Sequence, residues 1–332
     1  MTLAIRTWII VALVTLAGAA GAAPATSVGY QYARFPGPDG RVIELSIWYP
    51  SETPASLQPF GPFEQTVAKN GAVAGTALPL VVISHGTGGS FGGHYDTAQA
   101  LARSGFVVAA LSHPGDNFQD RSDSFTWRNF VERPRQLSAT IDYMLTAWGE
   151  RDRIDATRVG VFGHSAGGFT ALASVGGALE LARGVRFCRE HPEDWGCARA
   201  RAKNVKFSSE DGTAASWAAD PRIKAIGVAA PAAANMFTPE SLARITVPVQ
   251  LWEAQNDRIV SNGIIGPALA KPPELHVVPN AGHFDFLAPC SPALAARIPE
   301  ICESPPGFDR AAFHEELNRE IAAFFAAALE VK

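Results

Sequence analysis

The chain has 332 residues, of which 47% are hydrophobic and 18% charged, and its mean hydropathy is +0.05. With 30 Gly and 24 Pro scattered along it, this composition excludes a collagen-like, low-complexity or wholly disordered protein. A formal net charge of -4 leaves no basic excess to indicate a nucleic-acid partner. We expect one domain over residues 24–332, because α/β folds often exceed about 250 residues as a single unit.

Residues 1–23 have the organisation of a secretory signal peptide. One charge, Arg6, precedes an apolar run over residues 8–16, and small residues follow over 17–23. An uncleaved anchor is the alternative reading, but the apolar run is short for a membrane span of about 20 residues. We therefore expect a secreted or periplasmic protein with no stable membrane span after cleavage.

The predicted strands follow in chain order. Residues 41–49 alternate apolar and polar side chains, which suits an edge or half-exposed antiparallel strand. Later runs are short and continuously apolar, which indicates strands buried on both faces of a parallel sheet. These runs are Leu78 to Ile83, Phe106 to Leu111, Val159 to Phe162, Ile223 to Ala229, Val247 to Trp252 and Leu275 to Val278.

Helix-like segments alternate with these runs. They are Tyr95 to Arg103, Pro134 to Ala147, Ala166 to Ser174 and Arg310 to Leu329. The alternation of strands and helices predicts a wound α/β sheet flanked by helices. Residues 177–219 interrupt the alternation, and an excursion of this length in a compact fold predicts a lid-like insertion.

The four cysteines form two local pairs, Cys188 with Cys197 and Cys290 with Cys302. Export would place them where thiols oxidise, so we expect two short disulfides. Free buried thiols are the alternative, and four cysteines formally allow three pairings. Neither pair has the spacing of a zinc site.

The segment Gly163-His164-Ser165-Ala166-Gly167 matches the pattern G-x-S-x-G of a nucleophile elbow. A second match occurs at Gly88-Gly89-Ser90-Phe91-Gly92, so context must separate the two. Ser165 directly follows a predicted strand and opens a predicted helix, whereas Ser90 lies five residues beyond a strand end. We therefore predict Ser165 as the nucleophile and Ser90 as a loop residue.

A serine nucleophile needs a base and an orienting carboxylate, which follow it in the chain order Ser, Asp or Glu, His. His283 lies just past the strand Leu275 to Val278, and Asp257 follows the strand Val247 to Trp252. Functional loops of a wound sheet lie at strand carboxyl ends, so we predict His283 as base and Asp257 as acid. The competing residues are Glu253 for the acid and His276 and His314 for the base.

The oxyanion hole should combine the N–H after the nucleophile, Ala166, with one from the loop after an early strand. His85-Gly86-Thr87-Gly88-Gly89 is such a loop, and we predict Thr87 N–H as the second donor. A glycine-rich turn without a catalytic part is the alternative.

Other residues near these loops carry weaker signals. His113 and Asp116 end another predicted strand, but no third ligand can be named, so no metal site is predicted. Several apolar residues flank the catalytic segments, where they could line a substrate pocket, although most residues of this kind form core. They are Phe91, Phe169, Trp217, Met236, Phe237, Phe284 and Phe286.

Three stretches carry a family resemblance: Ser84-His85-Gly86-Thr87-Gly88-Gly89, Gly163-His164-Ser165-Ala166-Gly167-Gly168 and Ala281-Gly282-His283-Phe284. They resemble the α/β-hydrolase superfamily, in particular predicted dienelactone hydrolases and bacterial relatives of platelet-activating-factor acetylhydrolase. The likeness runs from about residue 40 to residue 330. It implies a serine esterase with an eight-stranded, mostly parallel sheet and no cofactor, acting on a small-molecule or lipid-like ester.

These observations favour a serine carboxylesterase that works through an acyl-enzyme intermediate. An acyltransferase or amidase would use the same triad, and a phospholipase A2-like acetylhydrolase is a further alternative. A non-catalytic binding protein that retains the fold is the third hypothesis.

Overall fold

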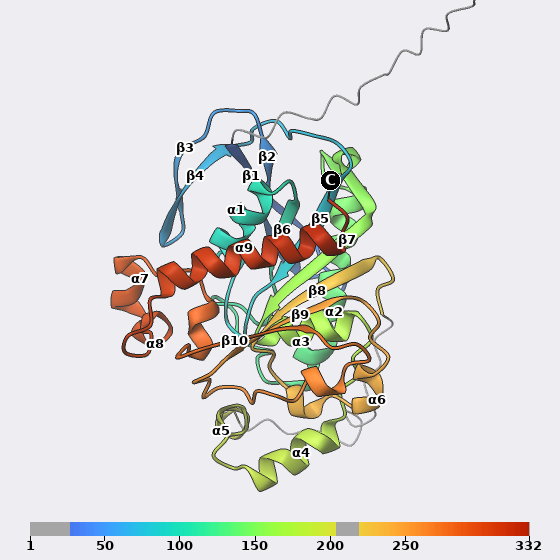
Figure 1. Ribbon diagram of the computed structural model, residues 1–332, viewed down its shortest axis with the longest axis vertical. Coiled ribbons are helices and arrows are strands. Elements are labelled where there is room, and N and C mark those ends of the chain that lie inside the picture. Colours follow the sequence, from blue (N-terminus) through green and yellow to red (C-terminus); the bar gives the residue numbers. More distant parts are fainter. Residues whose placement is uncertain (1–26, 204–218, 332) are drawn as a thin grey trace, which may run out of the picture.

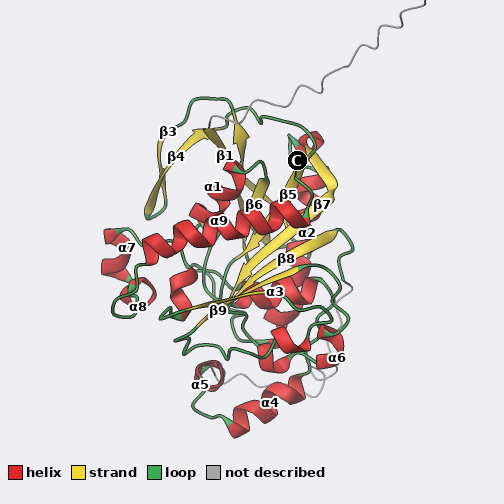
Figure 2. Cartoon of the chain, in the orientation of Figure 1, coloured by secondary structure: helices red, strands yellow, loops and turns green. Residues whose placement is uncertain are grey.

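The computed structural model describes residues 27–203 and 219–331. The predicted signal peptide, residues 1–23, and residues 204–218 of the predicted insertion lie outside the described residues. A central sheet runs through the molecule with helices on both of its faces (Figure 1, Figure 2). In the described residues, no helix combines the length and apolar character needed to cross a membrane.

The described sheet has ten strands. In spatial order they are β10 (Glu274–Val278), β9 (Val249–Ala254), β8 (Ile223–Ala229), β7 (Ile154–His164), β5 (Leu78–Ser84), β6 (Val107–Ser112), β2 (Val42–Ser51), β1 (Ser27–Pro36), β4 (Phe63–Lys69) and β3 (Ser56–Phe60). The six strands from β10 to β6 are all parallel, as predicted. The mostly parallel α/β sheet is therefore confirmed, but the described sheet has ten strands rather than eight. The prediction that Leu275 to Val278 is buried on both faces is wrong, because β10 lies at the edge of the sheet and Leu275 and Val277 are 52% and 50% exposed.

The additional strands lie at one edge of the sheet. β3 and β4 form an antiparallel hairpin, and the end of β4 pairs in parallel with the start of β1. The prediction that residues 41–49 form an antiparallel strand is confirmed, but its placement as an edge or half-exposed strand is wrong, because β2 lies between β1 and β6. Alternate residues of β2 enter the cores on the two faces of the sheet, so Ile47 and Trp48 are both fully buried.

An apolar core lies on each face of the sheet, and each core is covered by its own helices. α1 (Tyr95–Arg103) and α9 (Arg310–Ala328) pack against one face of the sheet, and α2 (Trp127–Thr146) and α3 (Ala166–Ser174) pack against the other. Figure 1 shows α9 crossing in front of the sheet, with α2 and α3 behind it. Except for the start of α2, these helices match the predicted segments to within one residue at each end.

The start of α2 differs from the prediction that a helix begins at Pro134. The helix begins at Trp127, with Thr126 as its N-cap, and Pro134 lies inside it. Proline costs a helix one hydrogen bond, but the two turns before it are held by tertiary contacts. Asn129 and Arg133 both donate to the buried carboxylate of Asp116.

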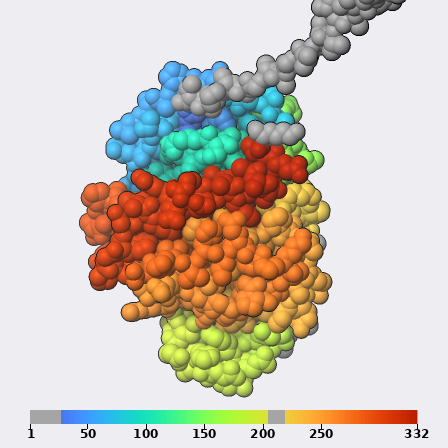
Figure 3. All heavy atoms as spheres, in the orientation of Figure 1, coloured from blue at the N-terminus to red at the C-terminus, as the bar shows by residue number. Residues whose placement is uncertain are grey.

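Shorter helices complete the fold. They are α4 (Leu181–Glu190), α5 (Trp195–Ala202), α6 (Pro239–Leu242), α7 (Pro292–Arg297), α8 (Pro299–Cys302) and the 3-10 turns η1 (Arg151–Arg153), η3 (Ala234–Met236), η4 (Gly266–Ala268) and η5 (His283–Phe286). α4 and α5 belong to the predicted insertion and form one end of the molecule (Figure 3). The structure joins Cys188 to Cys197 within this pair, with 5.3 Å between Cα atoms, and Cys290 to Cys302, with 5.6 Å. Both pairs are those that the sequence predicts.

Candidate active site

Ser165 occupies a sharp turn between β7 and α3. Its backbone has φ 55° and ψ -118°, a conformation that L-residues rarely adopt. Two glycines permit this turn. A Cβ on Gly163 would lie 2.1 Å from the Gly167 carbonyl oxygen, and a Cβ on Gly167 would lie 1.8 Å from the Ser84 carbonyl oxygen. The glycines of the motif are therefore required by close backbone approach, which is the geometry that lifts a serine hydroxyl above a sheet.

The structure brings Ser165, His283 and Asp257 into one hydrogen-bonded chain. The Nε2 atom of His283 is 3.0 Å from Ser165 Oγ, and its Nδ1 atom is 2.8 Å from Asp257 Oδ2. The side chains of His283 and Asp257 are 3% and 0% exposed. A carboxylate only accepts hydrogen bonds, so Nδ1 donates to Asp257 and Nε2 accepts from the serine hydroxyl. This is the arrangement that general-base catalysis requires.

Asp257 is itself fixed by the turn that follows β9. Its second oxygen, Oδ1, accepts from the backbone N–H groups of Ile259 at 2.8 Å and Val260 at 3.0 Å. Both carboxylate oxygens therefore have partners although the group is buried. The turn orients the carboxylate, and the carboxylate orients the imidazole.

The competing residues lie outside this chain. His276 stacks on Trp252 at 3.9 Å between ring centroids and contacts Glu274. His314 contacts Asp96 and the carbonyl of Asp285. Their roles are structural.

The other two competitors are also engaged in local contacts. Glu253 accepts from the N–H of Gly263 at 2.7 Å. Ser90, in the second G-x-S-x-G match, accepts from the N–H of Gly92 within its own loop.

The predicted oxyanion loop lies directly against the nucleophile. A Cβ built on Gly86 would be 3.2 Å from the Cβ of Ser165, so the loop passes close beside it and Thr87 follows immediately. Ala166 is the first residue of α3, and the first N–H groups of a helix have no partner inside the helix. The two segments predicted to supply the oxyanion donors therefore both adjoin Ser165.

His85 anchors the beginning of this loop. The backbone N–H of His113 donates to its Nε2 at 3.0 Å, so its Nδ1 carries the proton and donates to the Gly86 carbonyl at 2.6 Å. Burial, with a contribution from the nearby Arg133 cation, lowers the pKa of His85 well below its usual value. The residue is thus a neutral linker that holds the loop to β6.

A buried ion pair beneath the loop escaped the sequence analysis. Arg133 and Asp116 are both fully buried, and Arg133 Nη1 is 2.7 Å from Asp116 Oδ2. Arg133 also donates to the carbonyl of His85, and Gly88 N–H donates to Asp116 at 3.2 Å. The pair therefore ties both ends of the oxyanion loop to α2. No local pattern in the sequence links residues 116 and 133.

The side chains of His113 and Asp116 are both engaged by other protein groups. His113 Nε2 contacts Ser84 and its Nδ1 contacts Gln136, each at 2.8 Å. Asp116 is engaged by Arg133. Across residues 27–203 and 219–331, no group of three or more His, Cys, Asp or Glu side chains is placed to hold a metal ion.

His164, which precedes the nucleophile, contacts both the backbone and the ring of the candidate base, His283. Its Nε2 is 3.1 Å from the carbonyl oxygen of His283, and the two ring centroids are 4.8 Å apart. Burial, together with the neighbouring His283 and His94, lowers the pKa of His164 well below its usual value. His164 is therefore neutral, and it donates to the His283 backbone without placing a charge beside the base.

The helices of the insertion contact elements on two sides of the site. α4 packs on η3, where a Cβ on Gly184 would lie 2.9 Å from Met236 Cγ. η3 follows Ala232, whose N–H donates to the Ser165 carbonyl at 2.9 Å. On the other side, the ring of Trp195 in α5 contacts Phe125 at 5.7 Å. The described part of the insertion thus contacts η3, which begins two residues beyond a backbone partner of Ser165, and the 121–125 loop.

The apolar residues proposed for a pocket divide into two groups. Phe169, Met236, Phe237 and Phe286 are buried in the cores. Phe91 and Phe284 are partly exposed, so they remain candidates for a substrate wall. Trp217 lies outside the described residues.

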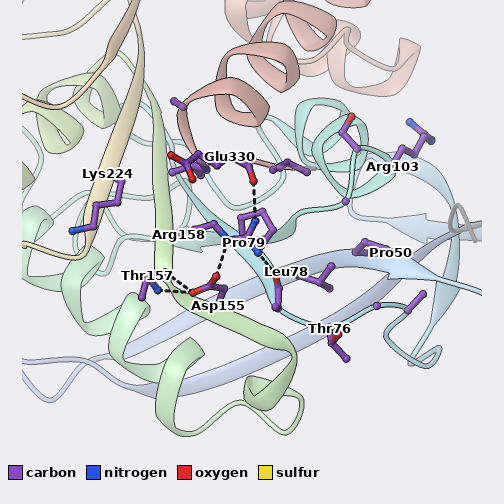
Figure 4. A pocket seen from close by; sticks show the side chains of 18 of the residues that line it. Pro50, Thr76, Leu78, Pro79, Arg103, Asp155, Thr157, Arg158, Lys224 and Glu330 are labelled. Atoms are coloured by element: carbon purple, nitrogen blue, oxygen red, sulfur yellow. Dashed lines mark hydrogen bonds and ion pairs between the residues drawn. The ribbon is translucent and has the colours of Figure 1, made fainter. Parts of the chain in front are cut away.

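A cavity of about 1050 Å³ lies at the opposite ends of the strands. It is bordered by Pro79 at the start of β5, by Asp155 and Arg158 near the start of β7, and by the last residues of the chain (Figure 4). Arg158 is paired with Asp155 there. Because the triad lies at the carboxyl ends of the same strands, this cavity is separate from the candidate active site.

The comparisons agree with this geometry. Residues 80–296 match the model of the Alpha/beta hydrolase family. The cutinase est1 of Thermobifida alba is 42% identical over 86 residues, which are 25% of this chain and 23% of that protein. The bis(hydroxyethyl) terephthalate hydrolase of Streptomyces coelicolor is 40% identical over 83 residues, 25% and 21% of the two chains. The matched segments span less than a quarter of these relatives.

Solved structures extend the likeness to nearly the whole chain at the level of the fold. The ferulic acid esterase of Streptomyces cinnamoneus aligns with a TM-score of 0.58 and 22% identity over 93% of each chain. The dienelactone hydrolase of Anabaena variabilis aligns with a TM-score of 0.51 and 14% identity, over 90% of this chain and 99% of that one.

Proposed function

Because the chain belongs to the alpha/beta hydrolase family, we propose that it is a carboxylic-ester hydrolase that uses Ser165, His283 and Asp257 as a catalytic triad. The observation that carries this proposal is the continuous hydrogen-bonded chain from the Asp257 carboxylate through His283 to the Ser165 hydroxyl. The relatives with local sequence matches are named as ester hydrolases, which supports an ester as substrate.

In the first half of the reaction, Ser165 Oγ attacks the ester carbonyl carbon while His283 Nε2 takes the hydroxyl proton. The carbonyl oxygen becomes an oxyanion, which the N–H groups of Thr87 and Ala166 stabilise. The intermediate collapses as the ester C–O bond breaks, and His283 returns the proton to the departing alcohol. An acyl group remains on Ser165.

In the second half, water attacks the acyl carbon and gives a proton to His283. The second tetrahedral intermediate breaks the bond to Ser165, and His283 returns the proton to the serine oxygen. The product is a carboxylic acid. Asp257 keeps the imidazole oriented throughout and stabilises its transient positive charge.

Two features of the site support this scheme. The side chains of His283 and Asp257 are almost completely buried, so water competes little for their hydrogen bonds. Ser165 is held in its strained turn by the Ala229 carbonyl, which accepts from the Ser165 N–H at 2.9 Å. The reacting groups are thus positioned before substrate binds, which reduces the entropy cost of reaction.

The proposal includes export and a covering role for the insertion. Two disulfides support an oxidising compartment, which agrees with a signal peptide over residues 1–23. α4 and α5 border the site through η3 and the 121–125 loop, which supports a role in limiting the size of the substrate.

Replacement of the nucleophile tests the proposal. We expect Ser165→Ala to abolish labelling by a fluorophosphonate probe and to lower kcat for a nitrophenyl ester by about 10⁶-fold. Ser90→Ala is the matched control, because it alters the other G-x-S-x-G segment, and it should retain both signals. Labelling that persists in Ser165→Ala would refute the triad.

The reaction products show whether water or another nucleophile accepts the acyl group from Ser165. Incubation with a competing alcohol or amine should still yield mainly the free acid, since water is the acceptor in an esterase. A predominance of the transferred product would assign the same triad to acyl transfer instead.

A further inference from the structure

A cationic side chain lies over the oxyanion loop. The position that a Cβ would take on Gly88 is 2.8 Å from Arg121 Nε, 2.9 Å from its Cζ and 3.1 Å from its Nη2. The guanidinium therefore covers the face of Gly88 from which a side chain would project. Gly88 has φ +67°, a conformation that itself disfavours other residues. This glycine leaves room for the arginine.

The backbone of Arg121 is fixed although its side chain is exposed. Its carbonyl accepts from Lys203 Nζ at 2.7 Å, and from the N–H of Ser124 at 3.2 Å. Ser124 in turn donates to the buried carboxylate of Asp116. The loop that carries Arg121 is thus held from the insertion on one side and from the buried ion pair on the other.

The Arg121 guanidinium makes no hydrogen bond or ion pair with the part of the chain that the structure describes. The acidic groups around it already have partners. Asp116 is paired with Arg133, and Asp123 is 2.7 Å from Arg41 and 3.5 Å from Arg128. Arg121 is therefore a cation on an anchored backbone whose donors are free to bind a ligand, and guanidinium donors match the geometry of a carboxylate.

The surroundings favour an anion. Residues 181–203, which include both described helices of the insertion, contain six Arg and Lys against three Asp and Glu, although the whole chain has a net charge of -4. Lys203 brings this basic segment into contact with Arg121. The local field therefore attracts negative ligands towards the edge of the oxyanion loop.

The position of Arg121 relative to Ser165 indicates which kind of ligand could contact both residues. Gly86 lies against Ser165, and Gly88 is two residues further along the loop, at most about 7 Å away by backbone geometry. A ligand that joins a carbonyl carbon at Ser165 to Arg121 would therefore run along this loop. A dicarboxylic acid that is esterified at one end carries the required pair of groups, an ester carbonyl for Ser165 and a carboxylate for Arg121.

We propose that Arg121 forms an anion subsite that binds a free carboxylate on the ester substrate, so that the enzyme prefers half-esters of short dicarboxylic acids. This inference rests on the proposed ester hydrolysis and deepens it. Arg121 acts on specificity, since it binds a remote part of the substrate while the triad carries out the bond changes.

A matched pair of substrates tests the subsite. Mono(4-nitrophenyl) glutarate carries the carboxylate, and methyl 4-nitrophenyl glutarate masks it. We expect Arg121→Gln to lower kcat/KM for the anionic substrate by about 10- to 100-fold, as loss of a charge-assisted hydrogen bond does, and to leave the masked substrate nearly unchanged. Arg121→Lys should retain part of the preference, and added salt should weaken it, because the site is exposed.

Arg128→Gln is the control, because it removes the same charge from the neighbouring start of α2. If Arg121→Gln leaves the ratio of the two rates unchanged, or Arg128→Gln lowers it equally, the inference is overturned. Failure of the wild type to release nitrophenolate from either substrate would instead count against the proposed function.

Binding provides a readout that does not depend on turnover. In a Ser165→Ala background, calorimetric titration with mono(4-nitrophenyl) glutarate should show at least about tenfold weaker binding when Arg121→Gln is added. Equal affinity in the two proteins would overturn the inference even if the chemistry were absent.

Discussion

Neutralising Asp116 should damage both the fold and the oxyanion loop. The carboxylate receives four donors: Arg133 and Asn129 on one oxygen, and Gly88 and Ser124 on the other. In Asp116→Asn one of these oxygens becomes an NH₂ group, so at least two donors face another donor. Arg133 also keeps its charge, fully buried, without a counterion.

The magnitude follows from that burial. Removing one partner of a buried ion pair typically costs about 3–5 kcal/mol, a large part of an ordinary stability of about 5–15 kcal/mol. The remaining amide oxygen should face the Arg133 cation, which places the NH₂ group towards Gly88. Gly88 then loses its acceptor, so the neighbouring Thr87 donor is no longer held in place. We expect kcat/KM to fall by about 10- to 100-fold, less than the roughly 10²–10³-fold loss for deletion of an oxyanion donor.

Urea unfolding measures the first effect, and ester hydrolysis well below the unfolding midpoint measures the second. Asp123→Asn is the control, because Asp123 pairs with the partly exposed Arg41 and Arg128 and its loss should cost at most about 1 kcal/mol. Equal destabilisation by the two substitutions, or full activity of folded Asp116→Asn, would refute the idea that the ion pair holds the loop.

Two further predictions concern the insertion and the response to acid. Gly184→Leu should force α4 away from Met236 and change the ratio of the hydrolysis rates of long and short acyl esters by about threefold or more. Val185→Leu, at the exposed neighbouring position, is the control. The same rate ratio in the two variants would show that the insertion has no role in specificity. Burial lowers the pKa of His94 to about 4 from its usual 6.5, so the unfolded chain binds a proton more readily than the folded one. The free energy of unfolding should therefore fall by about 3 kcal/mol from this group as the pH drops from 6.5 to 4, and urea titrations of His94→Phe should lack that component. A variant with the wild-type pH dependence would contradict it.

The inner parallel strands could be predicted because they are buried on both faces of the sheet. That burial leaves short, mainly apolar runs, as in Leu78–Ser84 and Val107–Ser112. The chain order of a serine, an acid and a base after three such runs then led to Ser165, Asp257 and His283, which the structure brings into contact.

The antiparallel edge could not be predicted in the same way. β1 and β4 mix exposed polar residues with buried ones, and β3 contains Pro59, which is tolerated at a sheet edge. Their strand character depends on pairing with each other and with β2, which no single segment encodes. The burial of β2 has the same origin, because it depends on β1 covering what would otherwise be an edge.

The supports of the site were missed for a related reason. Arg133 precedes a proline, which locally argues for a helix start, and its partner Asp116 lies in a turn where Asp is common. Each residue has an ordinary local meaning, and only the fold reveals the pair. The same holds for His164, whose contact with the His283 carbonyl joins positions 119 residues apart.

The insertion reaches the surroundings of the candidate active site along two chains of contacts. Through Met236 it reaches η3 and the Ala232 N–H that donates to Ser165, and through Lys203 it reaches the loop that carries Arg121 and Ser124. Ser124 leads on to Asp116 and hence to Gly88. We therefore expect a shift of the insertion helices to affect both the nucleophile and the oxyanion loop, and the proposed Arg121 subsite lies on the second of these paths. We accordingly expect the preferences for substrate charge and for substrate size to be coupled, because both depend on contacts of the insertion.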